Sequence, residues 1–437
     1  MDHPHREMVK FIIARLGENG FKALIAGGAV RDTMLGRKPE DLDILTNAPI
    51  ERLESLFSDQ QFKIVGRTFP VCLVNGVEVS ASRYGSGHAD FPESDLGRRD
   101  FTINAMAFDP VAEKIFDPFN GRKDLEDGII RFTCDPEKRI MEDPVRMVRA
   151  CRFAALINGS FSLSALELIM QNRDLVTDGI ARERIYNEIV KALSLEKPSL
   201  FFRALRETGL LVKIFPSLDR CWDLDGGPHH GETVFEHCLL VGDALPLSSP
   251  MLRLAGFLHD AGKFDAANRR KGHLSFEGHE NHVAAVVKDL ADLRFPGSDI
   301  DFITAMIKCH MRPLNPDTGP KAARRLLAML DRYSVSWRDF MRMRIADRKG
   351  NLAKPDYKIS QIRARVEILM KEIRNNSAFN MNALNISGRE IQRILGLPQG
   401  PEIGRIKRML FEKVVDNPEL NTPDNLEKLC RNLLTEK

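Results

Sequence analysis

The sequence predicts an α+β fold, in which an N-terminal head built on a mixed β-sheet is followed by a helical remainder. Short apolar runs separated by turns recur as far as about residue 128. After Asp135 the apolar residues return at spacings of three and four, which is the period of an amphipathic helix. The length of 437 residues is enough for two to four domains.

Composition and charge narrow the class of protein. A hydrophobic content of 43% and a charged content of 29% are ordinary for a globular protein in water. The net charge of +3 is too small to indicate a nucleic-acid partner, so such binding requires local clusters among the 64 Lys and Arg residues. Seven widely spaced cysteines predict reduced thiols. The sequence contains neither a signal peptide nor a run of membrane-spanning length, so we expect a cytoplasmic protein without a membrane partner.

Five short apolar runs are the predicted strands of the head, and an amphipathic helix precedes the first of them. The first strand leads into a pair of glycines. The last two strands flank Asn75-Gly76, a dipeptide typical of a type I′ hairpin turn. The predicted strands cover residues 24–26, 41–45, 63–65, 69–74 and 77–81.

The first chemical signal joins a glycine turn to an acidic strand. Gly27 and Gly28 let backbone N–H groups approach a phosphate, and the helix expected to follow adds partial positive charge at its N-terminus. Asp41 and Asp43 alternate with aliphatic residues, so they are expected on one strand face, where they can hold one or two Mg²⁺ ions. A Gly-Gly turn or an acidic strand alone is usually structural. Their order and spacing together favour phosphoryl or nucleotidyl transfer.

Other polar residues of the head are candidates for the same site. Glu78 alternates with valines and can supply a third carboxylate, although a solvent-facing glutamate fits this spacing equally well. Arg98 and Arg99 can bind phosphate or ribose oxygens, with Asn104 as a further polar contact. The alternative is that the paired arginines are simply solvated in a loop.

A base-reading helix is expected to begin at Pro144, with Asp143 as its cap. Asp143, Arg146 and Arg149 lie three residues apart and therefore share a face. A carboxylate can accept from the amino group of cytosine or adenine while a guanidinium donates to the ring nitrogen. Uracil and guanine would leave both groups unpaired, at a cost of about 1–3 kcal/mol each. Spacing alone favours the alternative of a cap and a surface salt bridge.

Read together, these segments resemble the class II template-independent nucleotidyltransferases, the family of tRNA CCA-adding enzymes and bacterial poly(A) polymerases. The resemblance runs from Leu24 to about Leu193 in consistent order. It implies tRNA, ATP and CTP as partners and no DNA, with the tRNA held by the helical body and tail. The matching stretches are GGAVRD, DLD, RRDFTINAM, DPFNGRKDL, EDPVRMVRACRFAA and ERIYNEIVKAL.

The resemblance also implies roles for single residues. It makes Asp41 and Asp43 the ligands of Mg²⁺, sets Arg31 and Arg99 near the triphosphate, and makes the pair at 143 and 146 a protein template for the base. With Glu78 as a third candidate, the predicted catalytic group has three carboxylates. The predicted nucleotide-binding residues are Gly28, Arg31, Arg98, Arg99, Asn104, Asp143, Arg146 and Arg149.

Eight of the eleven histidines fall between residues 229 and 310. The order of His237, the pair His259-Asp260, and Asp347 resembles the HD-domain phosphohydrolases. This resemblance implies a metal site made by those four residues. Imidazole and carboxylate ligands suit a divalent transition metal or Mn²⁺ better than Mg²⁺ alone. Hydrolysis of phosphomonoesters or cyclic phosphodiesters is the expected chemistry, and a relic that packs without metal is the alternative.

A second metal in the same domain has its own candidate ligands, His279 and His310. His282 lies three residues after His279, so the two would share the face of a helix, and the sequence does not choose between them.

The predicted domains are a catalytic head at 1–134, a base-recognising neck at 135–198, an HD-type domain at 199–375 and a tRNA-binding tail at 376–437. The leading hypothesis is a tRNA nucleotidyltransferase that adds CMP, CMP and AMP without a nucleic-acid template and carries an HD phosphohydrolase. A poly(A) polymerase, a CC-adding enzyme or an A-adding enzyme stays open, because all share the head motifs. An HD phosphohydrolase with a nucleotide-sensing head is a further alternative, although a sensor would not require paired metal carboxylates.

Overall fold

The computed structural model describes residues 3–39, 41–65, 71–81, 90–228, 230–270, 273–375 and 378–435. The chain divides into two compact units, Met1–Lys213 and Ile214–Lys437. The four-domain division therefore stays a prediction. Within the described ranges, no helix combines the length and the apolar character needed to cross a bilayer.

The head is built on a mixed sheet whose seven described strands follow the order β3-β4-β5-β2-β1-β6-β7. Only β2 and β5 pair in parallel. The five predicted strands are all present, except that residues 69–70 lie outside the described residues, and β6 and β7 were not predicted. The strands are β1 Ala23–Ala26, β2 Asp43–Thr46, β3 Phe62–Val65, β4 Val71–Val74, β5 Val77–Ala81, β6 Ala107–Asp109 and β7 Lys114–Phe116.

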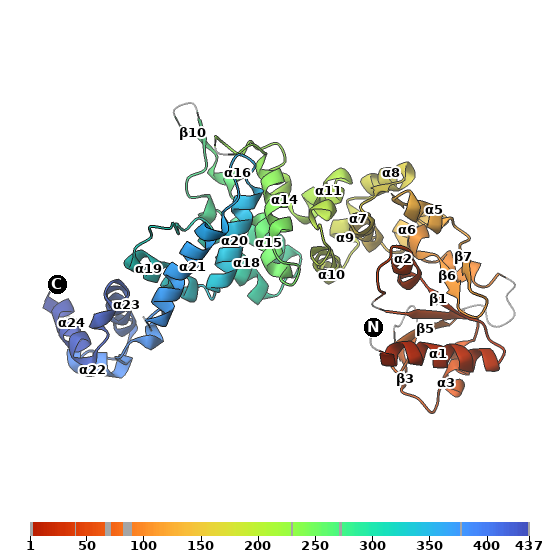
Figure 1. Cartoon of the computed structure of the whole chain (residues 1–437), viewed down its shortest axis with the longest axis horizontal. Helices are drawn as coiled ribbons and strands as arrows, with labels where there is room; N and C mark the ends of the chain where they lie inside the picture. The colour runs from red at the N-terminus through yellow and green to blue at the C-terminus, as the bar shows by residue number, and fades with distance from the viewer. Residues whose placement is uncertain are drawn as a thin grey trace. The chain divides into compact units, whose positions relative to one another are not determined.

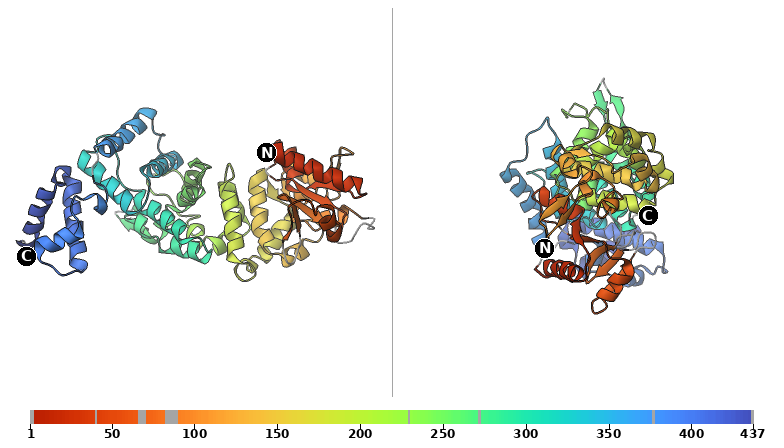
Figure 2. Two further views of the ribbon diagram at one scale, coloured as in Figure 1. Left: turned by 90° about the horizontal axis from the view of Figure 1, so that it is seen from below. Right: turned by 90° about the vertical axis from the view of Figure 1, so that its right-hand side faces the viewer.

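One face of this sheet is covered by the N-terminal helix α1 (His3–Glu18), which lies along the strands in Figure 1 and Figure 2. Its apolar residues Val9, Ile12 and Leu16 are buried in the same cluster as Ile44 of β2. Asn75-Gly76 closes the β4–β5 hairpin with φ of 49° and 85°, and positive values at both positions are what a type I′ turn requires.

The expectation that Asp41 and Asp43 share a strand is wrong in one respect, because β2 begins only at Asp43. Asp43 pairs with Ala26, which is the last residue of β1. The backbone leaves the sheet at the next residue, Gly27. Asp41 therefore has no strand partner and is exposed.

The rest of the first unit is mainly helical. Helix α7 (Val145–Ile157) packs against α10 (Arg182–Leu193) and α11 (Ser199–Glu207), with Val145, Val148 and Cys151 buried as their spacing predicts. The exceptions are two short strands, β8 Ile129–Ile130 and β9 Ser160–Phe161. The other helices are α2 Gly28–Met34, α3 Ile50–Leu56, α4 Glu93–Leu96, α5 Gly121–Glu126, α6 Pro136–Glu142, α8 Leu163–Gln171 and α9 Leu175–Asp178, with the 3-10 turn η1 Thr102–Asn104.

The second unit centres on helices α14 (Val234–Ala244), α15 (Pro250–Leu258), α18 (Gly297–Cys309) and α20 (Trp337–Gly350). Helix α14 packs against both α15 and α20, and α15 also contacts α18. The described part of this unit contains one short hairpin, β10 Asn268–Arg270 with β11 His273–Ser275. The remaining helices are α12 Leu211–Ile214, α13 Pro216–Asp219, α16 Lys263–Ala266, α17 Ala284–Asp292, α19 Pro320–Arg332 and α21 Ile359–Arg374, with the 3-10 turn η2 His279–Asn281.

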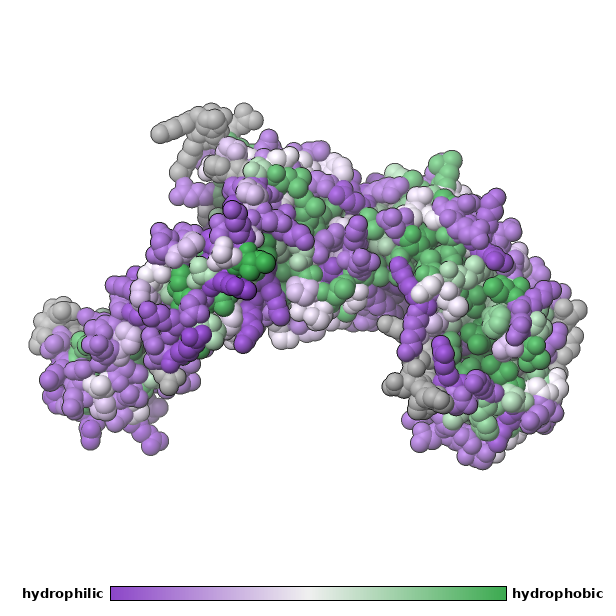
Figure 3. Space-filling view, in the orientation of Figure 1, coloured by the Kyte–Doolittle hydropathy of each residue, from purple (hydrophilic) through white to green (hydrophobic). Residues whose placement is uncertain are grey.

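The tail ends the chain with its own apolar cluster, which includes Ile391, Leu410 and Leu426. Ser387 caps α22 by accepting from the Glu390 N–H, while the Glu390 carboxylate accepts from the Ser387 N–H. Figure 3 shows a largely hydrophilic surface over these helices. The elements are α22 Gly388–Leu395, α23 Pro401–Asp416 and α24 Pro423–Thr435, with the 3-10 turns η3 Met381–Ala383 and η4 Pro418–Leu420.

Candidate functional site

The turn between β1 and α2 is shaped by Gly27. Its φ of +77° lies in the left-handed region, which glycine adopts without steric cost. A Cβ atom at this position would lie 2.0 Å from Nη1 of Arg99. Glycine is therefore required both for the backbone conformation and for the close approach of the Arg99 guanidinium.

The three predicted carboxylates of the head lie close enough to repel one another. Burial raises the pKa of Asp43, with Arg99 opposing the shift and Asp41 adding to it. Burial also raises the pKa of Glu78, and the charges of Asp43 and Asp41 add to that shift. All three donors are carboxylate oxygens, the ligand type that Mg²⁺ prefers, but only Asp43 is partly buried, whereas Asp41 and Glu78 are exposed.

A cavity of about 390 Å³ opens beside Asp43. Its walls come from the α2 turn, from the loop that carries the two arginines, and from helices α7 and α10. All eight predicted nucleotide-binding residues line it, together with Asp43. The lining residues are Gly28, Arg31, Asp43, Arg98, Arg99, Asp100, Asn104, Asp143, Arg146, Arg149, Phe153 and Arg184.

A buried chain of polar contacts fixes part of this wall. Asn104 accepts from Nη1 of Arg31 at 2.6 Å and donates to Oδ1 of Asp100 at 2.9 Å. The other oxygen of Asp100 accepts from Nη2 of Arg149 at 2.6 Å. Burial alone would raise the pKa of Asp100, but Arg149 and the hydrogen bonds hold it below its usual value. Arg149 also contacts Glu188 of α10 at 3.3 Å, so it links the head to the neck helices.

We expect Asp100→Ala to lower the free energy of unfolding by about 3 kcal/mol. This is the lower end of the range for broken buried pairs, because the Arg149 side chain is 30% exposed while Asp100 is only 9% exposed. Urea unfolding of the variant and of Asp127→Asn, an exposed control in the head, measures the difference. Equal stability of the two variants would contradict a structural role for the pair.

The expectation that Asp143 caps a helix is wrong. Helix α7 begins at Val145, and its preceding Pro144 provides no side-chain cap. The Asp143 carboxylate instead accepts two hydrogen bonds from Arg184, each 2.8 Å long. Two charge-assisted bonds are stronger than one bond to a backbone N–H, which explains why the side chain points toward Arg184. Arg146 donates to the carbonyl of Arg139 at 2.8 Å.

In the second unit, the four predicted ligands of the first metal come together from three separate segments, α14, the end of α15 and α20. Oδ2 of Asp260 lies 3.3 Å from Nε2 of His259 and 3.7 Å from Nε2 of His237. Nε2 of His237 lies 3.2 Å from Oδ1 of Asp347. Mixed imidazole and carboxylate donors therefore converge on one point, as a divalent metal requires.

The other oxygen of Asp260 faces the second predicted group. Oδ1 lies 2.9 Å from Nε2 of His279 and 3.5 Å from Nε2 of His310, and these two nitrogens are 3.2 Å apart. His279 is buried, whereas His282 is exposed and outside the cluster. The expected shared helical face is absent, because residues 279–281 form only a single 3-10 turn.

Two observations test whether these residues fit a metal. Nε2 of His259 is buried and lies 3.3 Å from Oδ2 of Asp260 without a well-aligned hydrogen bond to any residue the structure describes, an arrangement that a shared metal would satisfy. Burial would lower the pKa of His237, but the carboxylates of Asp347 and Glu232 raise it to about 9. The site therefore attracts positive charge, and a divalent ion would supply it.

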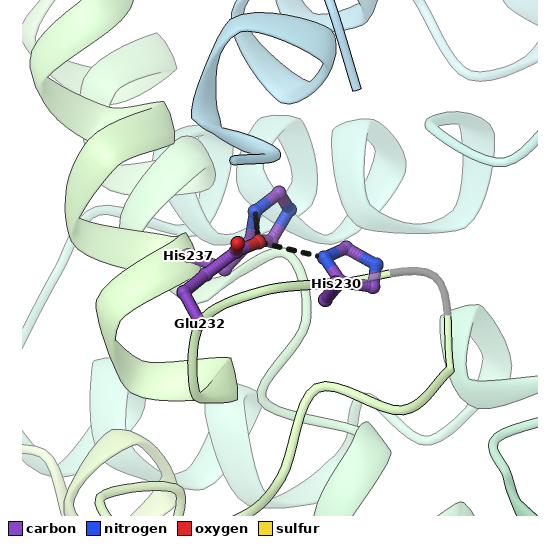
Figure 4. Close-up of side chains that lie close together, drawn as sticks. All are labelled: His230, Glu232 and His237. Atoms are coloured by element: carbon purple, nitrogen blue, oxygen red, sulfur yellow. Dashed lines mark hydrogen bonds and ion pairs between the residues drawn. The ribbon is translucent and has the colours of Figure 1, made fainter. Parts of the chain in front are cut away.

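Several residues of this cluster were not predicted from the sequence. Nζ of Lys263 lies 2.7 Å from Oδ2 of Asp260, and its position three residues after that aspartate is a signal that could have revealed it. Arg344 and Arg348 line the adjoining cavity of about 770 Å³, on the same helix as Asp347. The segment before α14 adds His230 and Glu232 (Figure 4).

The fold and the two clusters define a nucleotidyltransferase head joined to an HD domain, and comparison with family models agrees. The "Poly A polymerase head domain" matches residues 23–131. The "Probable RNA and SrmB-binding site of polymerase A" matches residues 162–221, and the "HD domain" matches residues 229–336.

Similar proteins carry both names of the expected family. The Multifunctional CCA protein of Laribacter hongkongensis is 34% identical over 68% of this chain and 78% of its own length. Poly(A) polymerase I of Haemophilus influenzae is 33% identical over 47% of this chain and 51% of its own length. The CCA-adding enzyme of Bacillus stearothermophilus, solved with CTP, shares the fold with a TM-score of 0.69 at 23% identity, covering 100% of this chain and 99% of its own. The chain belongs to the family of CCA-adding enzymes and bacterial poly(A) polymerases.

Proposed function

We propose that this chain adds CMP, CMP and AMP from CTP and ATP to the 3′ end of tRNA without a nucleic-acid template. The observation that carries the proposal is the single cavity that Asp43, Arg99 and Asp143 line together. The match to the Multifunctional CCA protein spans two thirds of the chain, whereas the match to poly(A) polymerase I spans about half. All seven cysteines are unpaired, which fits action in a reducing cytoplasm.

In this proposal each group of residues has its own role. Asp43 at the cavity, with Asp41 and Glu78, would hold Mg²⁺, which when bound would activate the tRNA 3′-hydroxyl and stabilise the departing pyrophosphate. The guanidinium groups of Arg31 and Arg99 bind the triphosphate and orient it for in-line attack. Arg98, Asn104 and Arg149 complete the polar wall around the nucleotide.

Asp143 and Arg146 select the base. The Asp143 carboxylate retains lone pairs beyond the two that Arg184 occupies, so it can still accept from the amino group of cytosine or adenine. Arg146 donates to the adjacent ring nitrogen once a base replaces its present contacts with the Arg139 carbonyl and the Glu142 carboxylate.

We expect Asp143→Ala to reduce the preference for CTP and ATP over UTP and GTP by about ten- to a hundredfold, because the variant lacks the carboxylate that accepts from the amino group of cytosine or adenine and cannot pair with uracil or guanine. Binding of the triphosphate should change less. Steady-state incorporation of each nucleotide, with Asp127→Asn as control, measures the ratio. Unchanged selectivity against UTP and GTP would contradict the template role.

The deciding experiment incubates the protein with tRNA that lacks its 3′ end and with each labelled nucleotide, and then sequences the extended termini. A terminal CCA supports the proposal. Products ending in CC, in a single A or in poly(A) would each assign one of the alternative activities of the family.

We also propose that the HD domain hydrolyses phosphomonoesters or cyclic phosphodiesters. This second function is supported by the carboxylates of Asp260 and Asp347, which line the same cavity as Arg344, Arg348 and Lys263. Nε2 of His259 lies 3.3 Å from Asp260. His237, His259, Asp260 and Asp347 would hold a transition metal, Mn²⁺ or Mg²⁺, which when bound supplies an activated water. His279 and His310 are the proposed ligands of a second metal, and the cationic side chains bind the substrate phosphate.

A further inference from the structure

Glu232 lies between two imidazoles in the segment that precedes α14 (Figure 4). Its side chain is 3% exposed, and its Oε1 atom lies 2.8 Å from Nδ1 of His230 and 3.2 Å from Nδ1 of His237. The other oxygen, Oε2, accepts from the backbone N–H groups of Gly231 and Leu352, each at 3.0 Å. A buried carboxylate with this many partners is held in one orientation.

These contacts act on two predicted metal ligands at once. The bond to Nδ1 of His237 fixes the ring so that Nε2 faces Asp347 and Asp260. Leu352 lies two residues after Gly350, the last residue of α20, and α20 carries Asp347. Because Glu232 holds the Leu352 N–H, it also fixes the end of that helix. One carboxylate therefore aligns ligands that lie 110 residues apart in the chain.

Glu232 and His237 do not fit a separate ion with His230. Nδ1 of His237 lies 3.2 Å from the carbonyl oxygen of Gly350 as well as 3.2 Å from Glu232. A ring nitrogen between two acceptors carries a proton and has no lone pair for a metal. Ligation by His237 must therefore use Nε2, on the side of Asp347.

We propose that Glu232 is a positioning residue of the HD-domain metal centre, which orients His237 through its Nδ1–H and Asp347 through the end of α20. This inference rests on the metal site of the proposed function. The same carboxylate also holds His230 at the wall of the cavity that adjoins the cluster. Ligating histidines commonly donate their second N–H to a carboxylate, and loss of that partner typically weakens metal binding about ten- to a hundredfold.

The test uses the full-length protein, stripped of metal and titrated with Co²⁺ by calorimetry and visible absorption, with excess Mg²⁺ occupying the oxygen-only site of the head. We expect Glu232→Gln to bind Co²⁺ about ten- to a hundredfold more weakly, with the same number of bound ions and an altered visible spectrum at saturation. Glu367→Gln is the matched control, since that side chain is 65% exposed on α21. Its affinity should equal that of the wild type.

Three outcomes would overturn the proposal, and they are distinguishable. Wild-type affinity in Glu232→Gln, while His259→Ala abolishes binding, removes the role of Glu232 but keeps the metal centre. A stoichiometry that falls by one ion in both Glu232→Gln and His230→Ala makes Glu232 a ligand instead. A wild type that binds no Co²⁺ removes the metal centre and the proposed hydrolase together.

The proposal can still be tested if Glu232→Gln does not fold. Thermal unfolding followed by circular dichroism checks each variant. Should Glu232→Gln fail to fold, Glu232→Asp keeps the charge but is one methylene too short to reach both the His237 ring and the Leu352 N–H. We expect it to show the same loss of affinity and the same spectral change.

Discussion

Replacing Asp43 with asparagine is expected to reduce nucleotide addition by at least about a thousandfold. Asp43 is the first residue of β2 and lines the cavity. The substitution keeps the size of the side chain but removes its negative charge. Loss of one metal carboxylate removes transition-state stabilisation of about 4 kcal/mol, which corresponds to this factor. Asp41→Ala should have an effect in the same direction, since its charge acts on the same group.

Binding of tRNA should be nearly unchanged in the Asp43 variant, because the proposed RNA contacts lie in the helical part of the chain. Single-turnover addition to a tRNA without its 3′ end, together with a filter-binding measurement, separates the two properties. Asp127→Asn is the control for a carboxylate of the head that lies outside the cavity. Addition that survives in Asp43→Asn would refute the metal role of this strand.

Local spacing was sufficient to predict that the glycine turn and the acidic strand lie together. Gly28 stands in the turn after β1, and Asp43 begins the strand paired with β1, so both line the cavity. Arg31, which also lines it, was expected only from the family resemblance. The histidines were predicted for a different reason. Their order along the chain matches a known family, and packing of α14, α15 and α20 then brings His237 and Asp347 together.

The predictions failed where a partner lies far along the chain. Asp143 was expected to cap a helix, but it meets Arg184, 41 residues away. Arg149 was predicted as a nucleotide contact, and its buried partner Asp100, 49 residues away, was not recognised. Glu232 was missed because a single glutamate before a helix has no periodicity that distinguishes it from a solvated residue. Sequence spacing predicts which residues share one face of a helix or strand. Which of these faces pack against each other depends on the tertiary fold.

Replacing His259 with alanine is expected to abolish phosphohydrolase activity, with a loss of at least about a thousandfold, while leaving nucleotide addition unchanged. His259 is fully buried, and its Nε2 atom faces Asp260, the carboxylate shared by both predicted metal groups. Its removal therefore breaks the centre of the cluster. The head lies in the other compact unit and shares none of these ligands.

Hydrolysis of p-nitrophenyl phosphate and of a cyclic nucleotide with Mn²⁺ or Co²⁺ measures the first activity, and addition to truncated tRNA measures the second. His282→Ala is a matched control, because that histidine is exposed and outside the cluster. It should retain both activities. Chelation followed by return of Mg²⁺ alone should restore addition in full and hydrolysis only in part, since imidazole ligands favour transition metals and Mn²⁺. Equal loss of both activities in His259→Ala would mean that the two sites are not separate, because His259 contacts only the cluster of the HD domain and should not affect the head.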